Sequence, residues 1–179
     1  VVGFSMGGLL ALKLAHERGG RVKGVAALAP AFEIDTISDL GLRVIRKLGI
    51  ASWLPHLPKS GGPDVSDPSI GRAMPSNEKM PIAAAQSLLT AQRDVRAVVG
   101  RLMMPVWIFQ GKQDHTVPVK SAKNLFKRLR MRDKKLIFYP HSWHILALDV
   151  EHEEVIEDVC GYIDRLYAND EVIGTERTS

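Results

Sequence analysis

The chain has 179 residues, of which 45% are hydrophobic and 25% are charged, a composition typical of one globular domain with a sizeable core. Its formal net charge of +4 is too small to indicate a nucleic-acid-binding protein, and no apolar run is long enough for stable insertion into a membrane. The single cysteine, Cys160, excludes an internal disulfide and fits a reducing compartment, so we predict a cytoplasmic protein.

The start of the chain carries its most specific pattern. Two valines lead into Gly-Phe-Ser-Met-Gly at residues 3–7, and helix-forming residues follow at once. A strand, a tight glycine turn and a helix in this order are typical of a nucleophile elbow. We interpret Ser5 as the nucleophile and the backbone N–H of Met6 as an oxyanion-hole donor. Glycines are expected at Gly3 and Gly7 because the turn leaves no room for a Cβ.

A second strand is predicted shortly after the elbow. The first helix should end near Arg18, where Gly19 and Gly20 supply a left-handed stop. Residues 21–29 then form a short apolar stretch that ends at Pro30. Because its apolar residues do not alternate with polar ones, it indicates a strand buried on both faces, as in a parallel sheet covered by helices.

Residues 31–102 differ in character and are predicted to form a lid inserted between two strands. A capping-box pattern predicts a helix over residues 36–48, and Pro81 marks the start of another helix. Between them, an irregular loop rich in proline and glycine is expected from Ser52 to Met80. A surface excursion without a lid function is the alternative interpretation.

The last part of the chain again alternates strands with helices. Buried strands are predicted at Pro105–Gln110 and Leu136–Tyr139, with a helix after each and a polar tail at 169–179. Cys160 belongs to the apolar stripe of the last helix, so we interpret it as a small core residue rather than a nucleophile. This alternation predicts an α/β fold with a parallel sheet.

Charge is unevenly distributed along this part of the chain. Residues 120–135 contain eight basic residues against Asp133, whereas residues 149–171 contain nine acidic residues against Arg165. We interpret them as two solvated helix faces that partly cancel. A nucleic-acid or anionic-membrane patch is the alternative, which the lack of interleaved aromatic residues disfavours.

Three loops at the carboxyl ends of predicted strands contain chemically reactive residues. Catalytic groups of open parallel sheets lie in such loops, and here the loops supply Ser5, Asp114 and His144 in chain order. A serine hydroxyl needs an imidazole as base, and the imidazole needs a carboxylate that fixes its tautomer. We therefore predict Ser5 as nucleophile, His144 as general base and Asp114 as orienting carboxylate.

Other histidines and acids compete for these roles. His141 lies near His144 at a spacing that suits metals, but no Cys, Asp or Glu cluster completes the site, so no metal or cofactor is predicted. His115 is interpreted as a residue of the acid loop only. Asp149 is expected to fix the backbone of the histidine loop, and Asp94 to form an ion pair. The other competitors lie in helices or in the lid: His16, His56, His152, Asp39, Asp64 and Asp67.

Four stretches match the motifs of one superfamily. They are Gly3-Phe4-Ser5-Met6-Gly7-Gly8, Asp94-Val95-Arg96, Gly111-x-x-Asp114-x-x-Val117-Pro118, and Ser142-Trp143-His144-Ile145 with Leu148-Asp149. Together they resemble the α/β-hydrolase superfamily, and more narrowly its small bacterial carboxylesterases and monoacylglycerol lipases. The resemblance implies a partial α/β-hydrolase fold, with a core at 1–30 and 103–168 and a helical lid insertion at 31–102. It also implies cofactor-independent hydrolysis of carboxylic esters.

The resemblance implies further strands before the elbow, including a loop that gives the second oxyanion N–H, often within a His-Gly pair. None of this precedes Val1, so we expect the C-terminal part of a longer enzyme. Its first strand would be an unprotected edge. We therefore predict weak activity for these residues alone, and self-association through that edge.

The expected substrate is a small ester with an apolar acyl chain, because the predicted lid residues are largely apolar. An acyl-enzyme can be resolved by other nucleophiles, so a peptidase or an acyltransferase is the alternative enzyme. A catalytically weak fragment that acts as a binding module is the alternative from another class.

Overall fold

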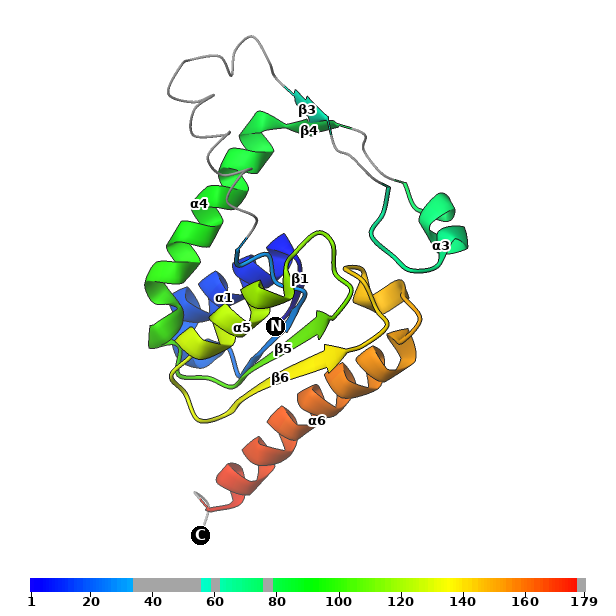
Figure 1. Cartoon of the computed structure of the whole chain (residues 1–179). Helices are drawn as coiled ribbons and strands as arrows, with labels where there is room; N and C mark the ends of the chain where they lie inside the picture. Colours follow the sequence, from blue (N-terminus) through cyan, green and yellow to red (C-terminus); the bar gives the residue numbers. More distant parts are fainter. Residues whose placement is uncertain (34–55, 59–61, 76–78, 177–179) are drawn as a thin grey trace.

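A four-stranded parallel sheet forms the centre of the molecule. The computed structural model describes residues 1–33, 56–58, 62–75 and 79–176 (Figure 1). The sheet order is β1-β2-β5-β6, with β1 at Val2–Phe4, β2 at Val25–Leu28, β5 at Val106–Gly111 and β6 at Lys134–Tyr139. The prediction of a parallel sheet flanked by helices is therefore confirmed, and each predicted strand exists within a few residues of its expected bounds.

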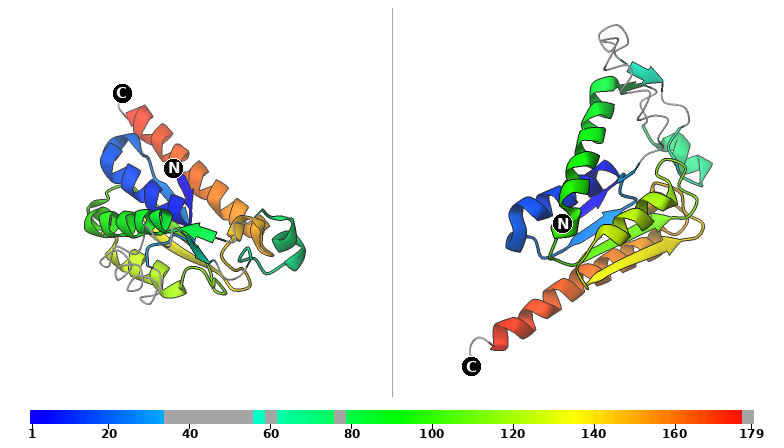
Figure 2. Two further views of the ribbon diagram at one scale, coloured as in Figure 1. Left: turned by 90° about the horizontal axis from the view of Figure 1, so that it is seen from above. Right: turned by 60° about the vertical axis from the view of Figure 1, so that its left-hand side comes forward.

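Helices cover both faces of this sheet. The longer helices are α1 at Met6–Arg18, α4 at Ile82–Val98, α5 at Val119–Arg128 and α6 at His152–Glu176. Figure 2 shows α6 on one face and α1 and α5 on the other. All four residues of β2 are buried. Val25 and Ala27 pack into the hydrophobic cluster under α1 and α5, while Ala26 and Leu28 pack into the cluster under α6. The unbroken apolar run in β2 follows from this double coverage.

The helix α6 corrects two expectations. It continues to Glu176, where a polar tail was predicted from residue 169. Cys160 is exposed, so the interpretation of this residue as part of the core is wrong. The side chains that pack towards the sheet are Val155, Val159, Tyr162 and Leu166. Cys160 follows Val159 and is therefore rotated by about 100° away from that stripe.

Tyr162 anchors α6 to the sheet. Its hydroxyl donates to the Pro105 carbonyl at 2.8 Å, and its ring stacks on Trp107 at 4.8 Å between centroids. Burial raises the pKa of the Tyr162 hydroxyl well above its ordinary value, so the group remains a protonated donor at neutral pH. The anchor holds the helix that follows the histidine loop.

The segment between β2 and β5 is more regular than the sequence indicated. Where an irregular loop was predicted, the described residues form α3 at Pro68–Ala73 and an antiparallel pair of β3, His56–Pro58, with β4, Lys79–Pro81. Asp67 caps α3 by accepting the Ser69 N–H at 2.7 Å. The helix α4 rises from the sheet towards β3 and β4 (Figure 1). The helix predicted over 36–48 lies outside the described residues.

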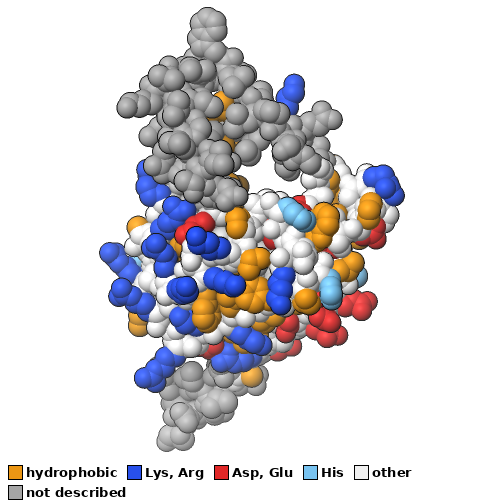
Figure 3. Space-filling view, viewed as in Figure 1, with side chains coloured by type: hydrophobic (Ala, Val, Ile, Leu, Met, Phe, Trp, Pro, Cys, Tyr) orange, Lys and Arg blue, Asp and Glu red, His pale blue; other side chains and the backbone are white. Residues whose placement is uncertain are grey.

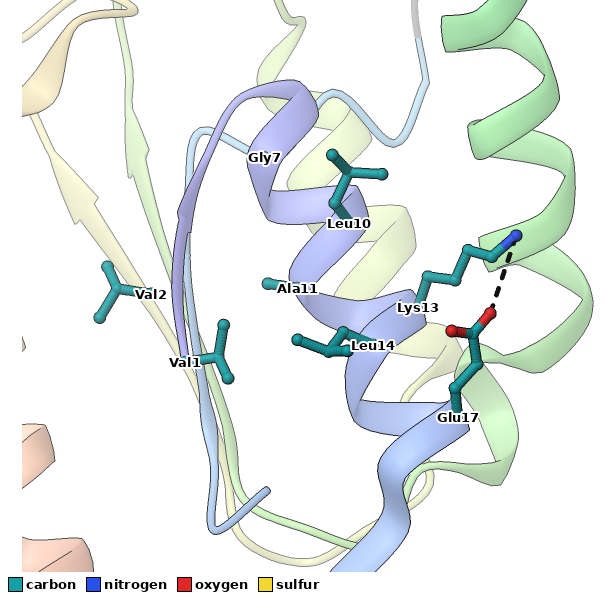
Figure 4. Close-up of a pocket in the computed structure, with 8 residues that line it drawn as sticks. All are labelled: Val1, Val2, Gly7, Leu10, Ala11, Lys13, Leu14 and Glu17. Atoms are coloured by element: carbon teal, nitrogen blue, oxygen red, sulfur yellow. Dashed lines mark ion pairs between the residues drawn. The ribbon is translucent and has the colours of Figure 1, made fainter. Parts of the chain in front are cut away.

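β1 is an edge strand with an apolar groove beside it. The groove measures about 420 Å³ and lies between β1 and α1 (Figure 4). Val1, Val2, Leu10 and Leu14 line it, and each is at least 38% exposed. A Cβ added at Gly7 would meet open space on this side, so the steric reason predicted for that glycine is wrong.

None of the helices in the described part of the chain is both long and apolar enough to cross a lipid bilayer.

Candidate active site

Ser5 occupies a strained position between β1 and α1. Its backbone has φ 52° and ψ −117°, a region that non-glycine residues rarely adopt. The Ser5 N–H donates to the Leu28 carbonyl at 2.8 Å, and the Ser5 carbonyl accepts the N–H groups of Gly8 and Ala31 at 3.1 Å each. These contacts to β2 and to the segment after it hold the turn in place, as expected of strain at a functional site.

Gly3 allows β1 and α1 to meet at this turn. A Cβ at Gly3 would overlap the carbonyl oxygen of Gly7 and lie 2.8 Å from the Gly8 nitrogen. The close approach is between backbone atoms, which cannot rotate away as a side chain could. The steric prediction for Gly3 is therefore confirmed.

The variant Gly3→Ala should lose about 2–3 kcal/mol of unfolding free energy, because overpacking against backbone cannot be relieved locally. Urea unfolding followed by circular dichroism measures this loss. Gly7→Ala is the matched control: it has open space around its Cβ and should change stability by less than about 1 kcal/mol. Equal losses in both variants would contradict the steric argument.

The structure brings together the three side chains that were predicted to act in catalysis. Ser5 Oγ lies 3.0 Å from His144 Nε2, and His144 Nδ1 lies 2.8 Å from Asp114 Oδ2. The Asp114 side chain is fully buried, and His144 is 6% exposed. The Phe4 ring packs against the His144 ring at 4.9 Å between centroids. The order of contacts runs from hydroxyl to imidazole to carboxylate.

Asp114 is oriented by three donors besides His144. Its Oδ1 accepts the N–H groups of Thr116 and Val117 at 2.9 and 2.7 Å. Its Oδ2 accepts from Gln110 Nε2 at 2.7 Å. Sequence reasoning did not single out Gln110. The available signal in the sequence was a polar residue at the end of an apolar strand. The structure shows that Gln110 is fully buried.

A comparison with known protein families identifies the family of this chain. A model of the hydrolase family described as "serine aminopeptidase, S33" matches residues 1–151. The chain belongs to this family of α/β hydrolases.

Two similar curated proteins are named as ester hydrolases. A carboxylesterase of Bacillus subtilis (strain 168) is 27% identical over 164 residues, which cover 92% of this chain and 63% of the relative. A thermostable monoacylglycerol lipase of Bacillus sp. (strain H-257) is 28% identical over 157 residues, covering 88% of this chain and 59% of the relative. The chain thus spans about three fifths of the length of these relatives.

Solved structures show the same fold. The monoacylglycerol lipase of Paleococcus ferrophilus superimposes with a TM-score of 0.80 at 20% sequence identity, covering 92% of this chain and 67% of that one. A lipolytic enzyme from the study of LipS and LipT superimposes with a TM-score of 0.78 at 22% identity, covering 92% of this chain and 64% of that one.

Two carboxylates hold the loop that contains His144. Glu151 accepts the N–H groups of His141 and Ser142 at 3.0 and 2.7 Å. Asp149, which is 1% exposed, accepts the Trp143 N–H at 2.7 Å and also the N–H and hydroxyl of Ser66. The expectation that Asp149 fixes the loop backbone is confirmed. The contact with Ser66 additionally fastens the loop to the segment that leads into α3.

We expect Asp149→Asn to lower stability by about 2–3 kcal/mol, because an amide offers one acceptor and turns a donor towards buried N–H groups. The loop should loosen, so the labelling rate of Ser5 by a fluorophosphonate should also fall. Thermal unfolding and labelling kinetics measure the two effects. Asp158→Asn, at the half-exposed partner of the Tyr139 hydroxyl, is the control. A labelling rate equal to that of the unmodified chain would contradict the positioning role.

The competing residues have other partners. The ion pair predicted for Asp94 is confirmed, with Lys13 Nζ at 3.0 Å. His115 Nδ1 lies 3.0 Å from Asp64 Oδ1, which ties the acid loop to residues 62–75. His141 is exposed, and His152 Nδ1 contacts the Asp149 carbonyl at 2.8 Å. The side chain of His56 and all of Asp39 lie outside the described residues.

The backbone next to Ser5 offers a hydrogen-bond donor for an anion. Met6 is the first residue of α1, so its N–H has no acceptor within the helix. The N-terminal end of a helix dipole favours negative charge at this point. In the described ranges, no group of three or more His, Cys, Asp or Glu side chains could hold a metal ion.

Proposed function

We propose that this hydrolase cleaves carboxylic esters through Ser5, His144 and Asp114. The observation that carries the proposal is the continuous contact from Ser5 Oγ through His144 to Asp114, at 3.0 and 2.8 Å. A buried carboxylate behind an imidazole favours the tautomer whose Nε2 can accept the serine proton. The names of the curated relatives support ester substrates.

The proposed reaction proceeds through an acyl-enzyme. Ser5 Oγ attacks the ester carbonyl carbon while His144 Nε2 takes its proton, and the Met6 N–H stabilises the oxyanion. The intermediate collapses, and His144 gives the proton to the leaving alcohol. A water molecule then loses a proton to His144 and attacks the acyl carbon. Release of the carboxylic acid returns the proton to Ser5.

Apolar surface next to Ser5 supports an apolar acyl group. Phe4 and Met6 flank the nucleophile and are 43% and 45% exposed. We propose medium-chain acyl esters or monoglycerides as substrates, with residues 31–102 as the cap that covers the acyl chain. Asp64 and Ser66 fasten part of this segment to the acid and histidine loops.

An aminopeptidase is the second candidate because the family description contains that word. Recognition of a free α-amino group requires a carboxylate near Ser5 that is not already engaged. Three described carboxylates contact the acid and histidine loops: Asp64, Asp149 and Glu151. Each of them is hydrogen-bonded to the loops. This arrangement favours the ester hydrolase.

Assays of p-nitrophenyl esters and of aminoacyl p-nitroanilides, run side by side, test the proposal. We expect ester hydrolysis with a preference for medium acyl chains and no amide hydrolysis. Added alcohol should give little transesterified product, which separates the hydrolase from an acyltransferase. Faster cleavage of the anilides would replace the proposal by the peptidase alternative.

Turnover by these residues alone is proposed to be slow. Met6 is the one oxyanion donor that we assign within the described residues, and the loss of one donor costs about 100- to 1000-fold in turnover. Covalent labelling of Ser5 is therefore a more sensitive measure of the site than ester turnover.

The cytoplasmic location also stays a prediction that rests on the single cysteine.

We further propose that two copies of the chain associate along β1. Val1 and Ser5 make their backbone hydrogen bonds to β2, so the backbone groups of Val2 and Phe4 point to the open edge. Pairing of two such edges around a two-fold axis would be antiparallel and would cover the apolar groove.

The variant Val2→Lys should weaken this association by about tenfold or more, because a charged side chain on an edge strand opposes pairing. Sedimentation velocity over a range of concentrations measures the effect. Val150→Lys introduces the same charge at a residue that is 58% exposed outside the sheet, and should associate like the unmodified chain. An unmodified chain that is monomeric at every concentration would contradict the proposal.

A further inference from the structure

A basic cavity lies where α4 and α5 end. It measures about 500 Å³, and the described residues that line it include no carboxylate. The five charged side chains in its wall are Arg96, Arg101, Lys127, Arg128 and Arg130. They come from the end of α4, from the short helical turn Val99–Arg101 that follows it, and from the end of α5 with the turn after it. Lys and Arg side chains gather on this flank, on the left of Figure 3.

The cavity is separate from the proposed catalytic site. Residues 99–101 lie shortly before β5, and residues 128–130 lie shortly before β6, so the cavity is at the amino ends of the strands. Ser5, Asp114 and His144 follow the carboxyl ends. The six residues of β5 alone separate the two ends by about 20 Å.

Among the described residues, neither helix capping nor ion pairing accounts for these charges. Lys134 Nζ already donates to the carbonyl of Phe126 in α5 and to that of Leu129, the residue after the helix, at 3.1 and 2.6 Å. Described carboxylates of neighbouring elements have other partners: Asp94 pairs with Lys13, Asp133 with Arg165, and Glu33 accepts from Asn124 Nδ2 at 2.6 Å. In the described structure, the basic segment 120–135 and the acidic segment 149–171 therefore meet at one ion pair, Asp133 with Arg165. The acidic segment does not neutralise the charges of the cavity.

Two of the guanidinium groups are held in place. Arg96 and Arg128 lie over the buried Phe32 ring at 5.7 and 5.9 Å from its centroid. Arg96 Nη2 donates to the Phe32 carbonyl at 3.1 Å, while its buried Nε has no partner among the described residues. Cations fixed before binding lose little side-chain entropy when an anion arrives.

We propose that this cavity binds a small, multiply charged phosphate ligand from solution. Clustered like charges repel one another, and a polyanion relieves that repulsion. Arginine, which supplies four of the five cations, binds phosphate oxygens in pairs through its planar guanidinium. No aromatic residue lines the cavity within the described structure, so it lacks a stacking surface for a nucleobase. A lipid bilayer at this end would face away from the proposed catalytic residues.

Isothermal titration calorimetry with pyrophosphate at low ionic strength tests the proposal. The unmodified chain should show saturable binding at one site and a raised melting temperature. The double variant Arg101→Gln, Arg130→Gln should bind about tenfold or more weakly. Arg18→Gln with Arg21→Gln removes the same charge from exposed residues that do not line the cavity, and should bind within about twofold of the unmodified chain.

Several outcomes would overturn this inference. They are heats no larger than those of sodium chloride at equal ionic strength, equal weakening in both double variants, or binding to phosphatidylglycerol vesicles without binding of pyrophosphate. If circular dichroism shows that the Arg101→Gln, Arg130→Gln variant does not fold, Arg130→Gln alone replaces it. Binding of pyrophosphate by the unmodified chain that does not saturate would also overturn the site. None of these measurements depends on ester hydrolysis, so the result is independent of the proposed function.

Discussion

Replacing Ser5 with alanine should abolish covalent labelling by a fluorophosphonate probe. The probe phosphonylates an activated serine, and Ser5 Oγ is the hydroxyl that lies within 3.0 Å of an imidazole nitrogen at His144. Removal of the nucleophile or of the base of such a centre costs about 10⁶-fold in rate. Intact-protein mass spectrometry measures the fraction labelled over time. His144→Ala should retain the serine but label only weakly.

Ser87→Ala is the matched control for this experiment. Ser87 is exposed on α4, and its hydroxyl donates to the Ala83 carbonyl at 2.9 Å rather than to a histidine. Its loss should leave labelling unchanged. Persistent labelling of the Ser5→Ala variant would disprove the nucleophile assignment. A folded, unmodified chain that resists the probe would instead favour the binding-module alternative.

Replacing Asp114 with asparagine should slow labelling of Ser5 by about 10⁴-fold while leaving the fold intact. An asparagine can present its amide N–H₂ to His144 Nδ1, which stabilises the tautomer that carries its proton on Nε2. His144 could then no longer accept the proton of Ser5. The donors from Gln110, Thr116 and Val117 fix the carboxylate, so the amide has little freedom to rotate. The second-order rate constant of labelling is the quantity to measure.

The variant Asp67→Asn controls for the loss of one carboxylate. Asp67 caps α3 from the surface, and asparagine is an equally good N-terminal cap. Hydrogen bonds from the Ser69 hydroxyl and N–H hold the pKa of Asp67 below its ordinary value. Its replacement should leave labelling within about twofold. A similar small effect at Asp114 would remove that residue from the proposed mechanism.

Local patterns were sufficient to predict which residues form the candidate site. The turn at Ser5 depends on residues that are adjacent in sequence, and the strands before Asp114 and His144 are marked by unbroken apolar runs. In a parallel sheet the carboxyl ends of the strands share one edge, so three separate loops could be placed together before any coordinates. The resemblance to α/β hydrolases rested on these same stretches.

Supporting contacts were harder to predict because they join residues far apart in the chain. Asp64 contacts His115, 51 residues further along the chain, and Asp149 contacts Ser66, 83 residues before it. No local spacing in the sequence encodes such pairs. Cys160 was misplaced for a related reason. A helix with apolar residues on adjacent positions has more than one possible buried face, and packing against Trp107 selected the one that contains Tyr162.

The sequence by itself determined the parallel α/β architecture, the elbow at Ser5 and the candidate acid and base, because strand burial and turn sterics depend on near neighbours. Only the tertiary structure decided how these groups are held and what else the surface presents. Gln110 meets Asp114, Asp149 meets Ser66, and five cations from separate segments surround one cavity. Each of these arrangements arises where different elements pack together, and packing brings side chains into contact without regard to their distance along the chain.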